Sequence, residues 1–591
     1  MTSNTLENLD EKEIRELALK YALLNAVKHE GRAQIGPVIS KIMAERPEYR
    51  KIAKQIARIV AEVVKEVNKK TVSEQRRILE EKWPELLVER KKEERKIGLP
   101  PLPNAEKYKV IKTRFAPNPD FVLHLGNARP ALLSYEYAVR YKGKMILRFE
   151  DTDPRIKRPL AEAYKAIKED LKWLGIKWDE EYIQSLRLEI YYEIARELIS
   201  RSGAYVDLCK PDEFRKYRNT GKPCPHRDKP VEDQLELWDK MLEGYFGEGE
   251  AVLRVKTPLD YPDPSVREWV AFRIIDTSKT PHPLVGDKYI VWPTYNFAAA
   301  VDDHLMEVTH ILRAKEHKTN TIKQQFLYKH MGWKYPEAIH FGRLKLEGFM
   351  LSKSKMRELM EKEDYEGYDD PRFGTLSALR KRGITPEAIR NIIMEVGVKH
   401  TDAVISYENL SAVNRKIVDP IAIRLMFTPH PFKVIIENAP ERIEIEIPLH
   451  PSNAELGKRR IVLEGTPVQV YVSSNDVDLI ERYRSFRLMD LGNLELVEID
   501  KGARTLTAKY IGNSLEEARR RRLPIIQWTP VHDNVDLILK KPVGDNLIYI
   551  MGKAEPYTRS VKSGTIVQFL RVGFARIHSV GEKIIAYYAH D

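Results

Sequence analysis

Three spacings of apolar residues follow one another along the chain and predict its layout. Between residues 14 and 88 the apolar positions recur every three or four residues, as in Ile56, Ile59 and Val63, which is the spacing of amphipathic helices. This part is predicted to be a helical domain. The highly charged stretch Glu89–Lys96 follows, and then GLPPLPNA, whose prolines exclude a helix or a central strand. A domain boundary is expected there.

Beyond this boundary, short apolar runs alternate with longer amphipathic segments. The runs VIKTRFAP and KMILRFEDTD are typical of strands, and residues 128–141 and 160–174 of helices. Strand, helix, strand and helix in this order predict a parallel α/β sheet. The polar segment 205–276 interrupts the pattern, which resumes at KYIVWPTYNFAAAVDDHL. We therefore interpret this segment as an insertion that splits one α/β domain.

The last part of the chain changes period again. Helical spacing returns between residues 375 and 417, and beyond Pro420 apolar residues fall at every second position, as in Val468, Val470 and Val472. Such short runs, separated by Gly, Pro and Asn, are typical of all-β barrels or sandwiches. We expect five parts: a helical extension (1–104), a split α/β domain (105–204 and 277–356), an insertion (205–276), a helical connection (357–420) and a β-barrel region (421–591).

Length and composition narrow the class of protein. A chain of 591 residues is too long for one core and needs several domains. Its net charge of +12 suits a basic face for a polyanion. Two cysteines cannot support a disulfide framework, the acidic start lacks the order of a signal peptide, and no apolar run reaches the roughly 18 residues of a membrane span. A cytoplasmic protein is expected.

The segment RFAPNPDFVLHLGNARP has the makeup of a nucleotide phosphate site. A predicted strand is followed by a stiff loop and a helix start, which hold Pro117, Asn118, His124, Gly126 and Asn127. Backbone N–H groups at a helix start favour an anion, a glycine lets a phosphate approach, and a histidine can donate to it. The alternative is a histidine that only caps the helix.

A second segment, GRLKLEGFMLSKSKM, lies more than two hundred residues later. Lys353 and Lys355 alternate there with Ser352 and Ser354 after a glycine-containing turn. This composition suits a mobile loop that closes over phosphates. Alone, such a loop is more often a solvated surface turn.

Together the two segments resemble the HIGH and KMSKS signatures of class I aminoacyl-tRNA synthetases. Within that class the chain is similar to glutamyl-tRNA synthetases of the archaeal and eukaryotic type, in RFEDTDP, PTYNFAAAVDDHLMEVTHILRAKEH, FRLMDLGN and IIQW. The resemblance implies a Rossmann-like catalytic core, an inserted domain that grips the acceptor end of tRNA, and C-terminal barrels that bind the anticodon. Two residues depart from the signatures: Met350 replaces the first lysine of KMSKS, and Asn127 the last histidine of HIGH.

The resemblance also assigns site residues. It makes His124 and Lys353 the catalytic candidates. The ATP site that it implies comprises Pro117, Asn118, His124, Gly126, Asn127, Arg343, Leu344, Ser352, Lys353 and Ser354, and the glutamate site comprises Arg114, Glu150, Tyr295 and Arg313. An anionic Glu150 suits the substrate's ammonium group, with a helix cap as its alternative role, and Tyr295 has an alternative role in the core.

Arg313 is the residue expected to separate glutamate from glutamine. It lies eighteen residues after Tyr295, where glutamyl enzymes place an arginine that the similar glutaminyl enzymes lack. A guanidinium forms a bidentate pair with a carboxylate but stays partly unpaired opposite an amide. The alternative for Arg313 is a surface salt bridge.

The activity that the resemblance implies is ATP-dependent attachment of L-glutamate to the 3′-terminal adenosine of tRNA(Glu), through glutamyl-adenylate and with Mg²⁺. Whether tRNA(Gln) is charged as well is left open, and a monomer or a member of a larger assembly is implied. Competing interpretations are a glutaminyl-tRNA synthetase, a shorter relative that glutamylates a tRNA base, a small nucleotidyltransferase and an inactive tRNA-binding scaffold. Arg313 disfavours the first of these, and the β-rich region disfavours the second.

The inserted segment holds both cysteines of the chain. Cys209, Cys224 and His226, with Asp207 and Asp228 nearby, have side chains that ligate zinc, and relatives carry zinc in this region. The CxxC spacing of such sites is missing. Two structural thiols are therefore the favoured interpretation, no metal ligand is assigned, and zinc is left open.

A run of four arginines precedes a predicted strand in the β-rich region: Arg519, Arg520, Arg521 and Arg522. Charge runs are usually solvated faces, but in a net basic protein they also suit an RNA backbone. We expect these arginines to contact tRNA.

Overall fold

The computed structural model describes residues 11–29, 31–46, 49, 52–83, 86, 98–362 and 364–591. The chain divides into two compact units, Met1–Ile97 and Gly98–Asp591. The predicted charged stretch, Glu89–Lys96, lies outside the described residues. None of the helices in the described ranges is long and apolar enough to cross a membrane.

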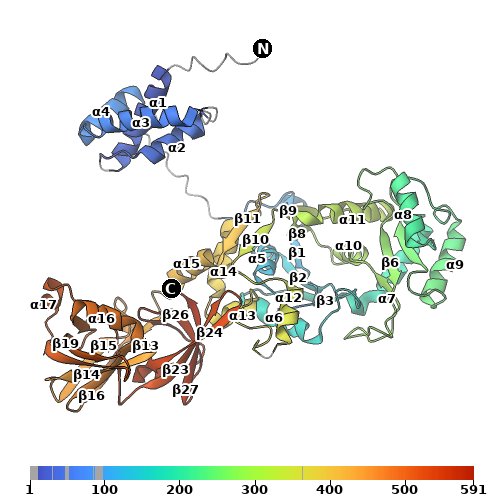
Figure 1. Cartoon of the computed structure of the whole chain (residues 1–591). Coiled ribbons are helices and arrows are strands. Elements are labelled where there is room, and N and C mark those ends of the chain that lie inside the picture. Colours follow the sequence, from blue (N-terminus) through green and yellow to red (C-terminus); the bar gives the residue numbers. More distant parts are fainter. Residues whose placement is uncertain are drawn as a thin grey trace. The chain divides into compact units, whose positions relative to one another are not determined.

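The described residues of the first unit form four α-helices, in agreement with the predicted helical domain (Figure 1): α1 (Glu11–Lys28), α2 (Ile35–Glu45), α3 (Ala53–Val67) and α4 (Val72–Lys82). Ile56, Ile59 and Val63 lie one turn apart on α3 and are buried in the core of this unit. Thr71 fixes the start of α4, because its hydroxyl accepts from the N–H of Glu74 while the Glu74 carboxylate accepts from the N–H of Thr71.

A parallel sheet lies at the centre of the second unit. β1 (Lys112–Phe115) pairs with β2 (Lys144–Phe149), β2 with β3 (Glu180–Ile183), and β8 (His310–Ala314) with β9 (Glu337–Phe341), all in parallel. β8 lies beside β1, where the N–H of Thr309 donates to the carbonyl of Lys112. The crossovers include α5 (Leu125–Arg140), α6 (Ala161–Trp173), α7 (Leu188–Ser200), α10 (Tyr295–Leu305) and α11 (Lys318–Met331). This is the predicted Rossmann-like core.

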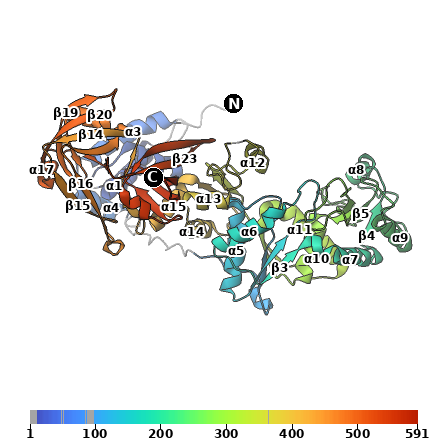
Figure 2. The ribbon, with the colours of Figure 1, turned by 90° about the horizontal axis from the view of Figure 1, so that it is seen from below.

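An antiparallel sheet interrupts the core. Its strands are β4 (Ala204–Asp207), β5 (Val252–Val255), β6 (Val270–Ile274) and β7 (Val291–Pro293), and it carries the helices α8 (Pro211–Thr220) and α9 (Val231–Leu242). Because β7 pairs with β6, this sheet continues past residue 276 to Pro293, into the segment KYIVWPTYNF. Figure 2 shows α8 and α9 close to β4 and β5.

A short helical region leads from the core to the β-rich part. It contains β10 (Leu344–Glu347), which pairs in parallel with β11 (Ala403–Ser406), and the helices α12 (Lys353–Met360), α13 (Leu376–Arg382), α14 (Pro386–Val396) and α15 (Tyr407–Val418). α13 packs on strands β26 (Gly573–Ser579) and β27 (Lys583–His590) of the C-terminal region.

Two seven-stranded sheets form the β-rich region (Figure 1). In sheet order the first comprises β12 (Ile423–Leu425), β25 (Ile566–Phe569), β26 (Gly573–Ser579), β27 (Lys583–His590), β23 (Val535–Val543), β24 (Asn546–Ala554) and β13 (Phe427–Pro429). The second comprises β21 (Ile525–Ile526), β18 (Ser485–Leu488), β19 (Gly492–Asp500), β20 (Thr505–Gly512), β14 (Pro431–Glu437), β17 (Val468–Ser473) and β22 (Thr529–Pro530). The helices α16 (Val477–Tyr483) and α17 (Leu515–Arg520) and the hairpin β15 (Arg442–Pro448) and β16 (Lys458–Glu464) complete the region.

Each of these sheets closes into a barrel. The two end strands of the first sheet, β12 and β13, are separated in the chain by Met426 alone, and those of the second, β21 and β22, by Gln527 and Trp528. The two edges of each sheet are therefore joined by one continuous stretch of backbone. β14 has alternating buried and partly buried residues, in agreement with the predicted period of two. Of the two alternatives left by the sequence, barrels are observed and sandwiches are not.

Candidate active site

A cavity of about 1130 Å³ opens at the carboxyl ends of β1, β2, β3 and β8. This is the edge where open parallel sheets bind their ligands. Most of the residues predicted for the ATP and glutamate sites line it: Arg114, Pro117, Asn118, His124, Gly126, Asn127, Glu150, Tyr295, Arg313, Arg343, Leu344 and Lys353.

The other predicted residues lie outside this cavity wall. Ser352 caps α12, since its hydroxyl accepts from the N–H of Lys355 at 3.4 Å, and it lies 3.2 Å from the hydroxyl of Ser354. The four arginines 519–522 are exposed at the end of α17 and just after it, in the second barrel. Two of them are engaged, Arg520 with Glu517 and Arg521 with the hydroxyl of Ser485.

His124 is fixed by the start of α5. The ring Nδ1 of His124 accepts from the backbone N–H of Gly126 at 3.0 Å. The backbone N–H of His124 donates to the side-chain oxygen of Asn127 at 3.1 Å. A Cβ at position 126 would lie 2.8 Å from the imidazole, so only glycine leaves the ring in this place. Because Nδ1 accepts, the neutral ring carries its proton on Nε2. Burial, assisted by the charge of Lys353, lowers the pKa of His124 to about 4, which keeps the ring a neutral donor.

Lys353 is held by a carboxylate that the sequence did not single out. Its ammonium lies 2.6 Å from the carboxylate of Asp120, and Arg357, on the same helix as Lys353, donates to the carbonyl of Asp120. The loop that begins at Pro117 is stiffened in turn, because Asn118 accepts from the N–H of Asp120 at 3.0 Å. The two predicted signature segments are thus joined directly beside His124.

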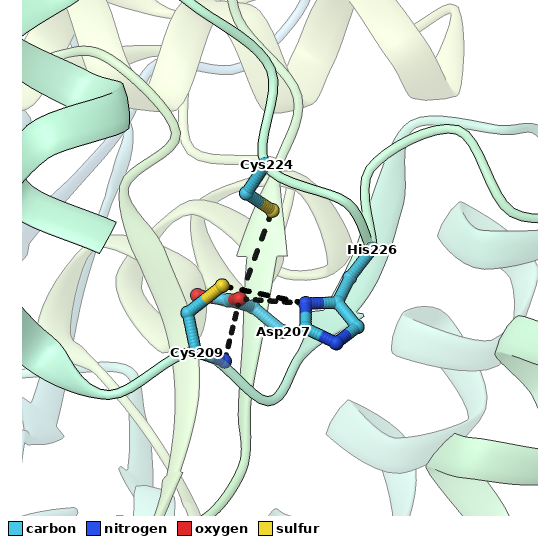
Figure 3. Close-up of side chains that lie close together, drawn as sticks. All are labelled: Asp207, Cys209, Cys224 and His226. Atoms are coloured by element: carbon cyan, nitrogen blue, oxygen red, sulfur yellow. Dashed lines mark hydrogen bonds and ion pairs between the residues drawn. The ribbon is translucent and has the colours of Figure 1, made fainter. Parts of the chain in front are cut away.

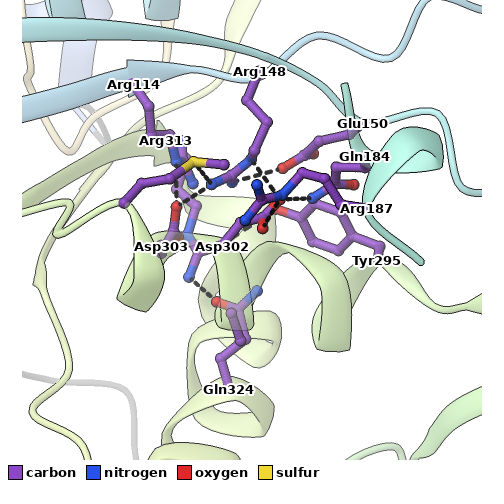
Figure 4. Close-up of polar contacts among 12 residues, drawn as sticks. Arg114, Arg148, Glu150, Gln184, Arg187, Tyr295, Asp302, Asp303, Arg313 and Gln324 are labelled. Carbon is purple, nitrogen blue, oxygen red and sulfur yellow. Dashed lines mark hydrogen bonds and ion pairs between the residues drawn. The ribbon is translucent and has the colours of Figure 1, made fainter. Parts of the chain in front are cut away.

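Buried arginines and aspartates lie behind one wall of the cavity and hold two of its lining residues, Arg114 and Glu150 (Figure 4). Asp303 accepts from Arg114 at 3.2 Å and from Arg148 at 2.8 Å, and Arg148 donates to Glu150 at 2.9 Å. Burial alone would raise the pKa of Asp303, but the two arginines hold it below its usual value. For Glu150, burial prevails over Arg148 and Arg114 and raises the pKa. Arg148 therefore orients Glu150 towards the cavity.

Arg313 differs from these arginines because none of its contacts with the described residues is a carboxylate. Its Nη2 donates to Thr321 at 2.5 Å, to Gln324 at 3.0 Å and to the hydroxyl of Tyr335 at 2.9 Å, while Nη1 lies 3.4 Å from the hydroxyl of Tyr295. The side chain is 5% exposed, and its Nε has no partner among the described residues. A buried charge without a counterion is costly, and this one lines the cavity.

The inserted domain brings four zinc-ligating side chains together (Figure 3). The ligand atoms of Asp207, Cys209, Cys224 and His226 all lie within 4.8 Å of one another. His226 Nδ1 is 3.5 Å from Cys209 Sγ and 3.3 Å from Asp207 Oδ1, and Cys224 Sγ is 3.7 Å from the same oxygen. A tetrahedral zinc site has ligand separations of roughly 3.3–3.8 Å. Asp228, the other nearby carboxylate, is exposed and pairs with Arg227 instead.

Sequence reasoning missed the residues that support the site. Asp303, Arg148 and Asp120 bind the predicted residues directly, and Gln324 and Tyr335 hold Arg313. The doublet Asp302-Asp303 in an otherwise apolar helical segment was the available signal, because buried carboxylates require partners. Nothing in the sequence showed which arginines these partners were.

Comparison with known proteins identifies the class. Residues 110–420 match the family described as tRNA synthetases class I (E and Q), catalytic domain, and residues 422–511 match the anti-codon binding domain of the same synthetases. The catalytic match covers more than half of the chain, which therefore belongs to the class I tRNA synthetases of the E and Q type.

Within that class the chain is similar to proteins named glutamate–tRNA ligase. It is 58% identical to the one from Hyperthermus butylicus and 55% identical to the one from Staphylothermus marinus, in each case over 96% of this chain and 100% of the relative. It is 52% identical to the one from Pyrococcus furiosus, over 98% of this chain and 100% of the relative. The resemblance to glutamyl-tRNA synthetases of the archaeal type is thus confirmed.

The contact between Gly126 and His124 generates a prediction. In Gly126→Ala the new methyl displaces the imidazole, and the Nε2 donor no longer points at its ligand. We expect kcat/KM for ATP in tRNA charging to fall about 100-fold, as on loss of one preorganised donor, with the KM for glutamate unchanged. Gly36→Ala is the control, since a Cβ there meets nothing within 4 Å. Equal ATP kinetics in the two variants would contradict this role of Gly126.

Proposed function

We propose that the chain charges tRNA(Glu) with L-glutamate in two steps, using ATP and the cavity at the carboxyl ends of β1, β2, β3 and β8. A carboxylate oxygen of glutamate attacks the α-phosphorus of ATP, pyrophosphate leaves, and a ribose hydroxyl of the terminal adenosine then takes the glutamyl group from the adenylate. One observation supports glutamate as the amino-acid substrate. Arg313 is a buried cation, and its contacts with the described residues are to uncharged hydroxyl and amide groups.

Arg313 is suited to the side-chain carboxylate of glutamate. The neighbouring arginines are already compensated, Arg114 and Arg148 by Asp303 and Arg187 by Asp302, whereas Arg313 would gain its counterion from the substrate. His340 lies 2.9 Å from Thr321 and does not add a charge, because burial and Arg313 lower its pKa to about 4. Glutamine would present amide donors to the guanidinium and leave it uncompensated. Glutamate is therefore preferred.

Glu150 is suited to the α-ammonium group of the substrate. It is held by Arg148 at 2.9 Å and lines the same cavity as Arg313. A bound ammonium favours the ionised carboxylate and offsets the effect of burial on its pKa. Glu150 and Arg313 would thus hold opposite charges of one amino acid and leave the α-carboxylate for reaction.

The phosphates of ATP are assigned to the start of α5. Gly126 allows close approach, neutral His124 donates through Nε2, and the ammonium of Lys353 would exchange Asp120 for a phosphate oxygen. The described carboxylates around this end of the cavity are already paired: Asp120 with Lys353, Asp153 with Arg273, Glu316 with Arg343 and Asp402 with Lys315. These described carboxylates form no dedicated metal site, so Mg²⁺ would enter with the nucleotide, bound by the oxygens of its phosphates.

The remaining parts are proposed to bind the RNA. The insertion, residues 205–276 with its sheet continuing to Pro293, would hold the acceptor end, and the barrels in residues 421–591 would bind the anticodon. Arg519 and Arg522 are exposed and make no ion pair within the described part of the chain, which suits contact with the RNA backbone.

A second proposal concerns zinc, and the grouping of Asp207, Cys209, Cys224 and His226 supports it. Two thiolates, an imidazole nitrogen and one carboxylate oxygen make four ligands for a closed structural site. The other carboxylate oxygen of Asp207 is engaged by Arg254 at 2.6 Å, which orients the ligand oxygen. Bound zinc would tie the end of β4 to the segment before α9 and take no part in the reaction.

Charging assays with two transcripts test the proposed activity. We expect the full chain to charge tRNA(Glu) with glutamate and not with glutamine, and a parallel assay with tRNA(Gln) shows whether that transcript is accepted too. Arg313→Gln should lower kcat/KM for glutamate by roughly 100-fold or more, the cost of truncating one partner of a buried charge pair. Arg201→Gln, which removes an exposed pair with Glu197, is the control. Failure of wild type to charge either transcript would refute the activity.

The pKa of Glu150 generates a pH prediction. Burial raises it above the usual 4.5, so at acidic pH part of the free protein carries a neutral Glu150 that cannot pair with the ammonium. The KM for glutamate should fall as pH rises through this pKa, by at most about tenfold per unit, while the KM for ATP stays level. Glu150→Gln should raise the KM for glutamate and abolish its pH dependence. A KM that rises with pH would contradict this assignment.

Metal analysis tests the zinc proposal. We expect about one zinc per chain in protein purified from zinc-supplemented cells, measured by elemental mass spectrometry. Cys209→Ser and His226→Ala should lose the metal and lower the melting temperature, because the cross-link is gone. Asp228→Ala should keep it. Metal-free wild type with the same melting temperature as Cys209→Ser would refute the site.

A further inference from the structure

A second, smaller cavity lies where the inserted domain meets α11. Its volume is about 330 Å³. The lining side chains come from α8, from β5, from the segment leading into β6, and from α11. The charged residues of the lining are Arg215, Arg218, Arg254, Arg267, Glu268 and Lys323. Five of these six are cationic, so the cavity is strongly basic.

The carboxylates near this cavity are already engaged. Glu268, the lining carboxylate, pairs with Arg227 at 3.1 Å and also accepts from the N–H of Thr257 at 2.9 Å. Asp207 binds Arg254 at 2.6 Å, and the guanidinium of Arg254 also stacks on the ring of Phe214. Arg254 is therefore compensated, whereas Arg218, Arg267 and Lys323 form no ion pair with any of the described residues.

Arg218, Arg267 and Lys323 have N–H groups that could donate to a bound anion. The Nε of Arg218 is buried without a hydrogen-bond partner, and its guanidinium makes no ion pair within the described ranges. Arg267 donates to the carbonyls of Tyr261 and Arg218, both neutral acceptors. Burial lowers the pKa of Lys323, and the positive charge of Arg218 lowers it further. The carboxylate of Asp263 acts in the opposite direction but does not offset them. An anion bound between Arg218, Arg267 and Lys323 would offset the repulsion between their positive charges.

We propose that this cavity binds a phosphate group of an RNA backbone, held by Arg218, Arg267 and Lys323. A phosphate presents several acceptor oxygens to the planar forks of two arginines and to the point charge of a lysine. The volume admits the group together with its neighbouring ribose. This inference rests on the proposed function, because it takes tRNA as the source of the phosphate.

α11 gives the reason for choosing RNA rather than a free phosphate. Asn320 lines the active-site cavity, Thr321 and Gln324 hold Arg313, and Lys323 lines the basic cavity. At about 1.5 Å of rise per residue, Lys323 is only about 4.5 Å along the helix axis from Asn320. α11 has no acidic residue to repel a nucleic acid. An RNA whose end enters the active site thus has its terminal phosphates within reach of this cavity.

The test uses the full chain with Lys323→Gln and Arg218→Gln, and with Lys329→Gln as the control, since Lys329 is exposed on the same helix outside the cavity. Each cavity variant should raise the KM for tRNA about tenfold and make the salt dependence of tRNA affinity shallower by about one phosphate contact. The KM values for ATP and glutamate should stay unchanged, as should the melting temperature. Lys323→Arg, which keeps the charge, should restore the affinity. An equal loss in Lys329→Gln, or none in the cavity variants, would overturn the site.

Lysine acetylation, read by mass spectrometry, separates the sources of phosphate and the two proposals. Saturating tRNA should protect Lys323 and leave Lys329 reactive. Protection by inorganic phosphate but not by tRNA would overturn the RNA assignment. A chain that charges tRNA while Lys323 stays unprotected would refute the cavity and leave the proposed function standing. A chain that charges no tRNA would refute the proposed function. In that case protection of Lys323 by tRNA would support the RNA site in the cavity, and absence of protection would refute it.

Discussion

The carboxylate of Asp303 is the point on which the active-site wall depends. It binds Arg114 on β1 and Arg148 on β2 from its own position on α10, so one buried anion ties a helix to the two central strands. Arg148 passes this restraint on to Glu150 at 2.9 Å. Without Asp303 two buried guanidinium groups would lack their main counterion, a loss that typically costs about 3–5 kcal/mol.

The same wall shows how charge is divided between stability and binding. Arg114 and Arg148 have protein counterions, whereas Arg313 is surrounded by hydroxyl and amide oxygens that orient it without neutralising it. A compensated arginine holds the fold together but has little affinity left for a ligand. An arginine without a counterion lowers the stability of the free protein. When an anion binds, this unfavourable free energy is removed and contributes to the affinity. The structure keeps these two uses on separate residues of one cluster.

Much of this fold could be predicted from the sequence, because local spacing determines local structure. The repeat of Ile56, Ile59 and Val63 predicted a helix, and the alternation in 468–472 predicted a strand; both are observed. The parallel core was predicted for the same reason. The pairing of Asp303 with arginines more than 150 residues away could not be predicted, since periodicity carries no information about long-range partners. The domain limits and the roles of the site residues remain predictions.

The closure of both barrels has a consequence for how the C-terminal region meets other chains. Because the two end strands of each sheet are one continuous stretch of backbone, a foreign strand could add at these ends only by displacing that stretch. The hairpin β15–β16 is a separate two-stranded sheet, and its exposed face carries three charge pairs, Arg442 with Glu464, Arg460 with Glu444 and Lys458 with Glu446. An added strand would have to strip water from these charges. Addition of a further strand to this hairpin is thereby disfavoured.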